Sequence, residues 1–265
     1  MFYNFIIVFI LSVIIAVLSF KLKFLTFDGS ITQFILAILI LGLGNIKWAI
    51  PIIIFFLLSS MLTKLRTRIN KNVDIYFEKP GVRDSFQVLA NGGIGGLLVI
   101  FSQFTQSELL YFVYVSSIAA ACADTWATEI GTMWKTKTVN ILNFKVVEQG
   151  VSGAVSFYGF IASFLGAVII ALTSLNWISS NKLFILIIII VSGFIGSIVD
   201  SFLGASIQAQ YNCVVCGKIT EKKIHCMKSA DKIKGSRWIT NDVVNFSASI
   251  IGGFFFYLFS IFLKV

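Results

Sequence analysis

The sequence predicts an all-α fold, a polytopic transmembrane helical bundle of about eight spans with a small cytoplasmic loop that contains cysteines. Of the 265 residues, 57% are hydrophobic and only 12% are charged, whereas about one quarter of the residues of a soluble domain are charged. Apolar runs of the roughly 20 residues needed to cross the hydrocarbon core recur throughout the chain. We therefore expect one integral membrane domain over residues 1–265, with residues 206–240 as its main polar loop.

Charged residues divide the apolar sequence into the expected spans. The first begins without a basic region and is followed by no cleavage site, so we expect a retained helix rather than a signal peptide. The first three spans consist mainly of Ile, Leu, Phe and Val, whereas the later ones carry Gly, Ser and Ala at helical spacing. Such small residues predict close helix packing. The spans are expected near residues 2–20, 29–45, 47–63, 85–105, 109–133, 150–175, 182–205 and 243–263.

The basic residues predict the topology. All of the 21 lysines and arginines except Lys47, Lys182 and Lys264 fall in or beside the first, third, fifth and seventh connections. The positive-inside rule places these connections in the cytoplasm and both termini outside, and we expect the plasma membrane of a prokaryote. Basic loops that face anionic lipid explain the net charge of +9, so no nucleic-acid partner is expected.

Polar clusters within the later spans share one predicted depth. An ionisable side chain in hydrocarbon is costly, which makes each one a functional candidate. The fifth and seventh spans run inward and carry their carboxylates near their ends, whereas the fourth, sixth and eighth run outward and carry polar residues at their beginnings. We therefore expect all five clusters at the cytoplasmic interface. They contain Asp124, Thr128 and Glu129; Asp200 and Ser201; Arg83, Asp84 and Asn91; Ser156; and Asn241, Asp242 and Asn245.

Carboxylates beside amides and hydroxyls, with arginine nearby, suit a hydrated Mg²⁺ ion that carries phosphate groups. This combination predicts a phosphoryl-transfer or nucleotidyl-transfer site. Two alternatives remain open. Asp124 and Asp200 could pair with basic side chains in a purely structural role, or they could line a transport pathway. Transporters usually show inverted repeats and broken helices, and the sequence shows neither.

The last cytoplasmic loop carries a metal-binding pattern. Cys213 and Cys216 form a Cys-x-x-Cys pair followed by glycine, and His225 and Cys226 come later in the loop. This spacing is typical of structural Zn²⁺, and a reducing cytoplasm favours a metal over a disulfide. The alternative is reduced cysteines without metal, because the adjacent His225 and Cys226 must both reach one ion. Cys122 lies in a span and is expected to pack as a small apolar residue.

Five motifs together resemble those of an integral membrane family that contains plant phytyl-phosphate kinase and animal transmembrane protein nineteen. The resemblance covers roughly residues 30 to 260. It implies a kinase that transfers a phosphoryl group from a nucleoside triphosphate, with CTP as one candidate, to a lipid-soluble prenyl monophosphate held in the membrane lipid. The small residues of the later helices would then allow a lipid-accessible groove between them. The motifs are residues 87–93, 123–131, 153–159, 196–208 and 241–245.

The resemblance also implies roles for individual residues. Asp124, Glu129 and Asp200 would be the catalytic carboxylates and Mg²⁺ ligands, and zinc would be structural. Residues 143–145 and 151–152 depart from the family pattern, which leaves substrate contacts there open. The alternatives are a cytidylyltransferase that forms a CDP-lipid and a membrane transporter. The implied substrate-binding residues are Arg83, Asp84, Asn91, Thr128, Ser156, Ser201, Gln208, Asn241, Asp242 and Asn245.

Overall fold

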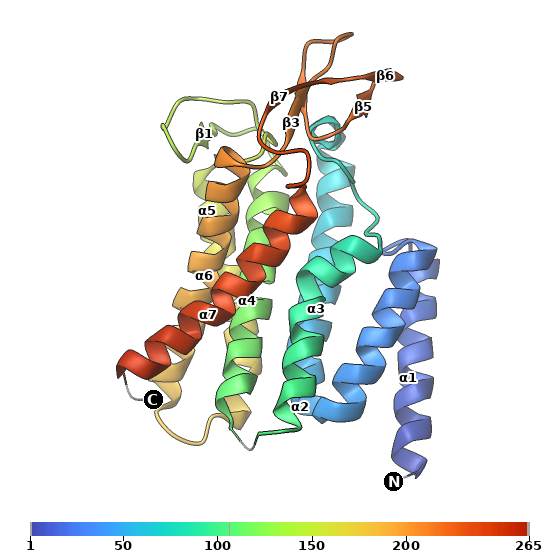
Figure 1. The fold of residues 1–265 in the computed structure, drawn as a ribbon, viewed down its shortest axis with the longest axis vertical. Coiled ribbons are helices and arrows are strands. Elements are labelled where there is room, and N and C mark those ends of the chain that lie inside the picture. Colours follow the sequence, from blue (N-terminus) through green and yellow to red (C-terminus); the bar gives the residue numbers. More distant parts are fainter. Residues whose placement is uncertain (1, 106, 264–265) are drawn as a thin grey trace.

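The computed structural model describes residues 2–105 and 107–263 and consists of one helical bundle with a polar cap (Figure 1). Five helices, namely α2, α3, α4, α6 and α7, are long and apolar enough to cross a membrane, and α1 and α5 contain shorter apolar helices. The predicted transmembrane helical bundle is confirmed. The helices are α1 (Phe2–Lys21), α2 (Phe27–Ile69), α3 (Ser85–Ser102), α4 (Leu109–Gly131), α5 (Phe157–Thr173), α6 (Lys182–Ser206) and α7 (Asn241–Leu263), with 3₁₀ helices η1 (Lys71–Ile75) and η2 (Leu175–Trp177).

Helix α2 is divided into two arms at Asn45. This residue has φ 57° and ψ −164°, outside the helical region, and asparagine is enriched among residues with positive φ. Its Oδ1 atom accepts a hydrogen bond from the Lys47 backbone N–H at 2.9 Å. The arms, 27–44 and 46–69, correspond to the second and third predicted spans, so the apolar helical segments match the eight expected from the sequence.

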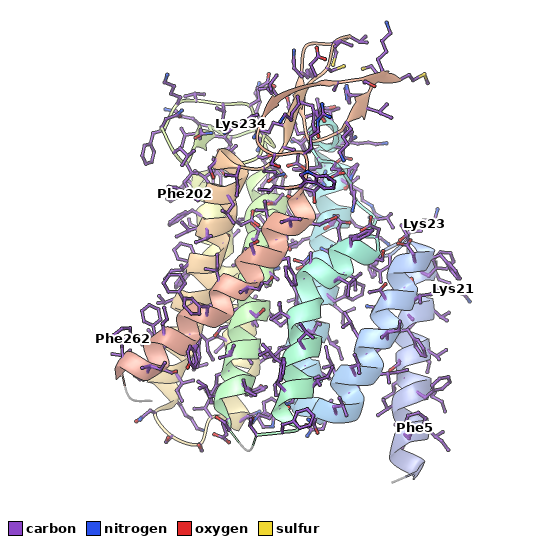
Figure 2. All side chains as sticks on the ribbon, in the orientation of Figure 1. Phe5, Lys21, Lys23, Phe202, Lys234 and Phe262 are labelled. Atoms are coloured by element: carbon purple, nitrogen blue, oxygen red, sulfur yellow. The ribbon has the colours of Figure 1, made fainter. Side chains whose placement is uncertain are left out.

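Successive helical segments run in alternating directions. The beginning of α1 and the end of α7 lie at one end of the bundle, and the cysteine-containing loop lies at the other, which we call the polar end (Figure 1). Lys21, Lys23 and Lys234 lie toward the polar end, and Phe5 and Phe262 lie toward the opposite end (Figure 2). Large apolar side chains are exposed along the helices between these ends, as a lipid environment requires.

Short strands occur in the connections at the polar end. One antiparallel pair closes the connection between α4 and α5, and a three-stranded antiparallel sheet of order β4-β3-β7 follows α6 together with a separate hairpin. Residues 206–240 thus form a small β-structured unit above the helices (Figure 1). The strands are β1 (Val139–Asn140), β2 (Ala154–Val155), β3 (Gln210–Asn212), β4 (Ile219–Thr220), β5 (Ile224–His225), β6 (Lys228–Ser229) and β7 (Asp231–Lys234).

The sixth predicted span begins too early. Residues 150–156 form a turn and strand β2 instead of helix, because Gly150 and Gly153 have φ values of 93° and 78°, which favour glycine and interrupt a helix. Helix α5 starts after Ser156, whose Oγ accepts a hydrogen bond from the Gly159 backbone N–H at 3.1 Å. This N-cap satisfies one of the free donors of the first turn.

Helix α4 forms the centre of the later bundle, where glycines allow backbones to touch. A Cβ atom added to Gly196 of α6 would lie 2.5 Å from the Ala120 Cβ, and one added to Gly252 of α7 would lie 2.6 Å from the same atom. A Cβ atom added to Gly166 of α5 would lie 3.1 Å from the Cys122 carbonyl oxygen. The close packing predicted from the small residues is therefore confirmed around α4.

Replacement of Gly196 by leucine is expected to destabilise the bundle. The new side chain would have to enter space held by Ala120 and by the Ala248 carbonyl oxygen, 3.0 Å from the added Cβ, and overpacking of this kind costs about 1–3 kcal/mol or more. The measurement is thermal unfolding of the purified protein in detergent. Gly42→Leu is the control, because its nearest contact is the Val8 side chain at 3.8 Å. Equal unfolding temperatures for the two variants would contradict the packing argument.

Candidate active site

A cavity of about 190 Å³ lies at the polar end, between the helix ends and the connections that cover them. Its walls come from α2 to α7, from residues 77–83 and 150–156, and from the β-structured loop. All of the predicted catalytic and substrate-binding residues except Asp84 line this one cavity, and their roles remain predictions. They are Arg83, Asn91, Asp124, Thr128, Glu129, Ser156, Asp200, Ser201, Gln208, Asn241, Asp242 and Asn245.

The side chains of Asp124 on α4 and Asp200 on α6 both line this cavity. The packing of α6 against α4 explains why these two side chains lie in the same cavity. Gly196 packs on Ala120, and one turn further along both helices the side chains are Asp200 and Asp124. Residues four apart share a helix face, so the contact that brings the backbones together also brings the carboxylates together.

Neither of these carboxylates has a basic partner in the part of the chain that the structure describes. Among residues 2–105 and 107–263, no lysine or arginine forms a salt bridge with Asp124 or Asp200. The Oδ2 atom of Asp200 is buried without a hydrogen-bond partner in the same part of the chain. Two adjacent carboxylates with an unsatisfied oxygen are an arrangement that a cation would stabilise.

Glu129 is held differently, because both of its carboxylate oxygens are occupied. Oε1 accepts a hydrogen bond from Thr63 Oγ1 at 2.6 Å, and Oε2 accepts from Arg66 Nε at 2.9 Å. Arg66 is buried and also pairs with Asp74. Glu129 therefore joins α4 to the second arm of α2 in a buried ion-pair network, in addition to lining the cavity.

Lys79 is a cavity residue that the sequence did not single out. Its Nζ lies 2.7 Å from an Asp84 oxygen and 2.5 Å from an Asp242 oxygen, so it joins the beginnings of α3 and α7. Burial opposes the charged form, but the hydrogen bonds to Asp242 and Asp84 outweigh it and raise the pKa of Lys79. The sequence feature that could have identified Lys79 is its position directly before Pro80 and Gly81, in a turn that precedes the polar beginning of α3.

Asp84 does not line the cavity because it caps α3. Its side chain accepts a hydrogen bond from the Gln87 backbone N–H at 3.0 Å, and the Gln87 side chain accepts from the Asp84 backbone N–H at 3.3 Å. This reciprocal capping box fixes the beginning of α3. The structure thus places Asp84 at the N-cap of α3 beside Lys79 and outside the cavity lining, and its role in substrate binding stays a prediction.

Glu221 brings the cysteine-containing loop into the cavity and was also missed. Its Oε1 accepts hydrogen bonds from Ser152 Oγ at 2.6 Å and from Gln208 Nε2 at 2.8 Å, and its Oε2 accepts from the Glu78 backbone N–H at 3.1 Å. Burial raises the pKa of Glu221 above its usual value, although the hydrogen bond from Ser152 acts in the opposite direction. The sequence feature that could have identified Glu221 is its position as a single carboxylate between the Cys-x-x-Cys pair and the later His-Cys pair.

The four residues predicted to bind zinc lie close together in the cysteine-containing loop. Ligand atoms of Cys213, Cys216, His225 and Cys226 all lie within 4.8 Å of one another. The adjacent His225 and Cys226 both reach the cluster because the chain turns sharply there, with φ values of 49° at Cys226 and 60° at Met227. This group can hold a metal ion, with the tetrahedral ligand number that structural sites use.

Together these features define an integral membrane protein with a polar cavity at one end of its helical bundle. The chain belongs to the family described as Integral membrane protein DUF92, which matches residues 10–253. This finding confirms the family membership predicted from the five motifs.

Three relatives illustrate the range of the family. Protein PGR of Arabidopsis thaliana is 29% identical over 269 residues, which cover 92% of each chain. Uncharacterized membrane protein MJ0933 of Methanocaldococcus jannaschii is 31% identical over 72% of this chain and 78% of that protein. Protein VTE6, chloroplastic, of A. thaliana is 23% identical over 77% of this chain and 57% of that protein. No solved structure matches the chain.

Arg66→Met is expected to lower the free energy of unfolding by about 3–5 kcal/mol, because it leaves the buried Glu129 carboxylate and the partly buried Asp74 carboxylate without their partner. Arg68→Met is the matched control. Arg68 lies two residues further along α2 and is exposed, so its loss should change stability by about 0.5 kcal/mol or less. Unfolding of both variants in the same detergent measures the difference, and similar stabilities would contradict the ion-pair network.

Proposed function

We propose that this protein is a membrane-embedded isoprenyl-phosphate kinase. It transfers the γ-phosphoryl group of a nucleoside triphosphate, with CTP as the first candidate, to a prenyl monophosphate and forms the diphosphate. The observation that carries the proposal is the convergence of Asp124, Asp200 and Arg83 in one cavity at the polar end. The reaction type comes from the resemblance to plant phytyl-phosphate kinase. The concentration of basic residues supports a cytoplasmic position for the polar end.

Asp124 and Asp200 fit a Mg²⁺ ion. Magnesium prefers one or two protein carboxylates together with substrate phosphates, and the buried Asp200 Oδ2 without a partner offers such a ligand. When bound, the ion would neutralise negative charge on the transferred phosphoryl group. Because both oxygens of Glu129 are hydrogen-bonded to Thr63 and Arg66, we assign Glu129 a positioning role rather than the metal-ligand role first expected.

Arg83 is the side chain proposed to hold the acceptor's phosphate. Its Nη1 donates to Ser60 Oγ at 3.0 Å, and within the described residues it forms no salt bridge. Its remaining donors can therefore hold an anion in the forked geometry that suits phosphate. In the reaction, an oxygen of the prenyl phosphate attacks the γ-phosphorus while the bond to the β–γ bridging oxygen breaks, which releases the nucleoside diphosphate.

The depth of the carboxylates supports transfer rather than ion-coupled transport. At 1.5 Å per residue, Asp124 and Asp200 lie about 10 Å from the polar ends of α4 and α6, and a hydrocarbon core is about 30 Å thick. The connecting loops also contribute to the cavity wall. At this depth a prenyl tail can stay in lipid while its phosphate meets a water-soluble nucleotide.

Purified protein should form a prenyl diphosphate from Mg²⁺, labelled nucleoside triphosphate and a prenyl monophosphate. Asp124→Asn should lower kcat/KM by about 100-fold or more, since metal-ion stabilisation is worth several kcal/mol. Asp231→Asn is the control, because Asp231 is exposed in β7. Equal activity of the two variants would remove Asp124 from the mechanism.

The position of the label separates the kinase from a CDP-lipid-forming cytidylyltransferase. With γ-labelled CTP, a kinase places the label in the lipid product, whereas a cytidylyltransferase releases it in pyrophosphate. Label in pyrophosphate would overturn the kinase proposal, but it would still support nucleotide binding in the polar cavity.

We also propose that the cluster in the loop holds structural Zn²⁺, because its thiolate and imidazole ligands suit this ion. Glu221 lies between Cys216 and His225 in the chain, so a bound ion would fix the segment that carries this carboxylate into the cavity.

Cys216→Ala should abolish bound zinc, whereas Cys122→Ala should retain it, since Cys122 is buried in α4 and outside the cluster. Elemental analysis of the purified variants gives the zinc content, with about one ion per chain expected for the unmodified protein. Loss of the loop's support for Glu221 should also lower the kinase rate. Zinc content that is unchanged in Cys216→Ala would contradict the assignment.

A further inference from the structure

A second cavity, of about 330 Å³, lies between α1, both arms of α2 and α3. Its volume falls within the range of small-molecule sites, about 300–1,000 Å³. Aliphatic and aromatic side chains form most of its wall, so a nucleotide or another strongly polar ligand would not fit there. The wall includes Ile15, Leu18, Leu36, Ile40, Ile52 and Phe56.

The apolar cavity and the polar cavity share part of their walls. Arg83, Gln87 and Asn91 line both. Gln87 and Asn91 lie on one face of α3 near its beginning, and Arg83 lies just before that helix. A ligand that fits this pair of cavities has an anionic head at Arg83 and an apolar tail, which is the chemistry of a prenyl phosphate.

The local sequence explains why this space exists. The chain reverses direction at Asn45, so the two arms of α2 both contribute to the cavity wall. On α3, Gly92 allows the side chains of Ile52 and Leu36 to pack close to the helix, at 3.2 Å and 3.3 Å from the position of an added Cβ, so a larger residue there would crowd them. We expected a lipid-accessible groove between the later helices, whereas this apolar cavity lies among α1, α2 and α3.

The apolar cavity also reaches the membrane-facing surface. Leu18, Leu22 and Leu57 line it, and their side chains are 50%, 49% and 44% exposed. A tail could therefore enter sideways from the lipid beside α1, which lies at the outer edge of the bundle (Figure 1). Lipid chains are as apolar as the cavity wall, so the wall would select the tail by shape, and the head group at Arg83 would supply most of the affinity.

We infer that this cavity holds the isoprenyl tail of the acceptor, with its monophosphate at Arg83, while the nucleotide enters the polar cavity from the aqueous side. The inference rests on the proposed kinase function and adds the location of the tail. It assigns tail recognition to α1–α3 and phosphate chemistry to the polar ends of α4, α6 and α7.

The direct test is photolabelling of the full chain in lipid nanodiscs. The probe is geranylgeranyl monophosphate with a diazirine on its terminal isoprene unit, and mass spectrometry of peptides locates the label. Label on α1, the arms of α2 and α3 is expected, and competition by unmodified geranylgeranyl monophosphate should remove it. Label confined to α5, α6 or α7 would overturn the inference.

A kinetic test uses Ala37→Phe, because Ala37 lines the apolar cavity and the larger side chain would fill it. The KM for the twenty-carbon acceptor should rise about tenfold, whereas the KM for dimethylallyl monophosphate and for the nucleotide should not change. Leu97→Phe is the control, since Leu97 is exposed on α3 and does not line the cavity. Equal effects on long and short acceptors would contradict the tail site.

The two proposals fail separately. Cavity labelling in a protein that has no kinase activity would overturn the proposed reaction alone. Kinase activity with labelling elsewhere would overturn the tail site alone. If Ala37→Phe fails to fold in a thermal unfolding measurement, the photolabelling map of the unmodified protein decides the question.

Discussion

The contact between α4 and α6 determines the geometry of the candidate site. Gly196 allows the two backbones to approach at Ala120, and one turn later Asp124 and Asp200 must lie together. Among the described residues these carboxylates have no basic partner, and two adjacent carboxylates repel each other unless one binds a proton or a cation joins them. In the proposed function, the packing of the later helices thus also creates the place where a metal and its phosphates would be bound.

The positive-inside rule and the alternation of helix direction were sufficient to predict the shared depth of Asp124, Asp200 and Asn241. These two rules predict only how far along the bundle axis a residue lies, and they do not predict which side chains meet across the bundle. Lys79 and Glu221 come from connections whose paths depend on tertiary contacts, and their sequence neighbourhoods indicated only a basic loop and a cysteine pattern. The pairing of Glu129 with Arg66 was likewise hidden, since the two residues are separated by 63 positions and meet only through helix packing.

The difference between local sequence signals and tertiary contacts also explains why the location of the apolar cavity was not predicted. Small residues in the later helices correctly predicted close approach, but close approach removes the space that a lipid tail needs. The nearly uniform Ile, Leu and Phe composition of the first helices carried no local signal for this cavity, whose wall forms only when α1, both arms of α2 and α3 pack together. The early helices would therefore face the lipid substrate and the later helices the phosphates, with Arg83 between them.

The most direct test of the central claim is the binding of Mn²⁺, as a paramagnetic substitute for Mg²⁺, followed by electron paramagnetic resonance with a non-hydrolysable nucleoside triphosphate analogue present. If Asp124 and Asp200 form one metal site, the unmodified protein will bind the ion, and Asp200→Asn will lose this binding while Asp231→Asn retains it. Unchanged Mn²⁺ affinity in Asp200→Asn would show that the two carboxylates do not hold the metal, and the account of the site would be wrong.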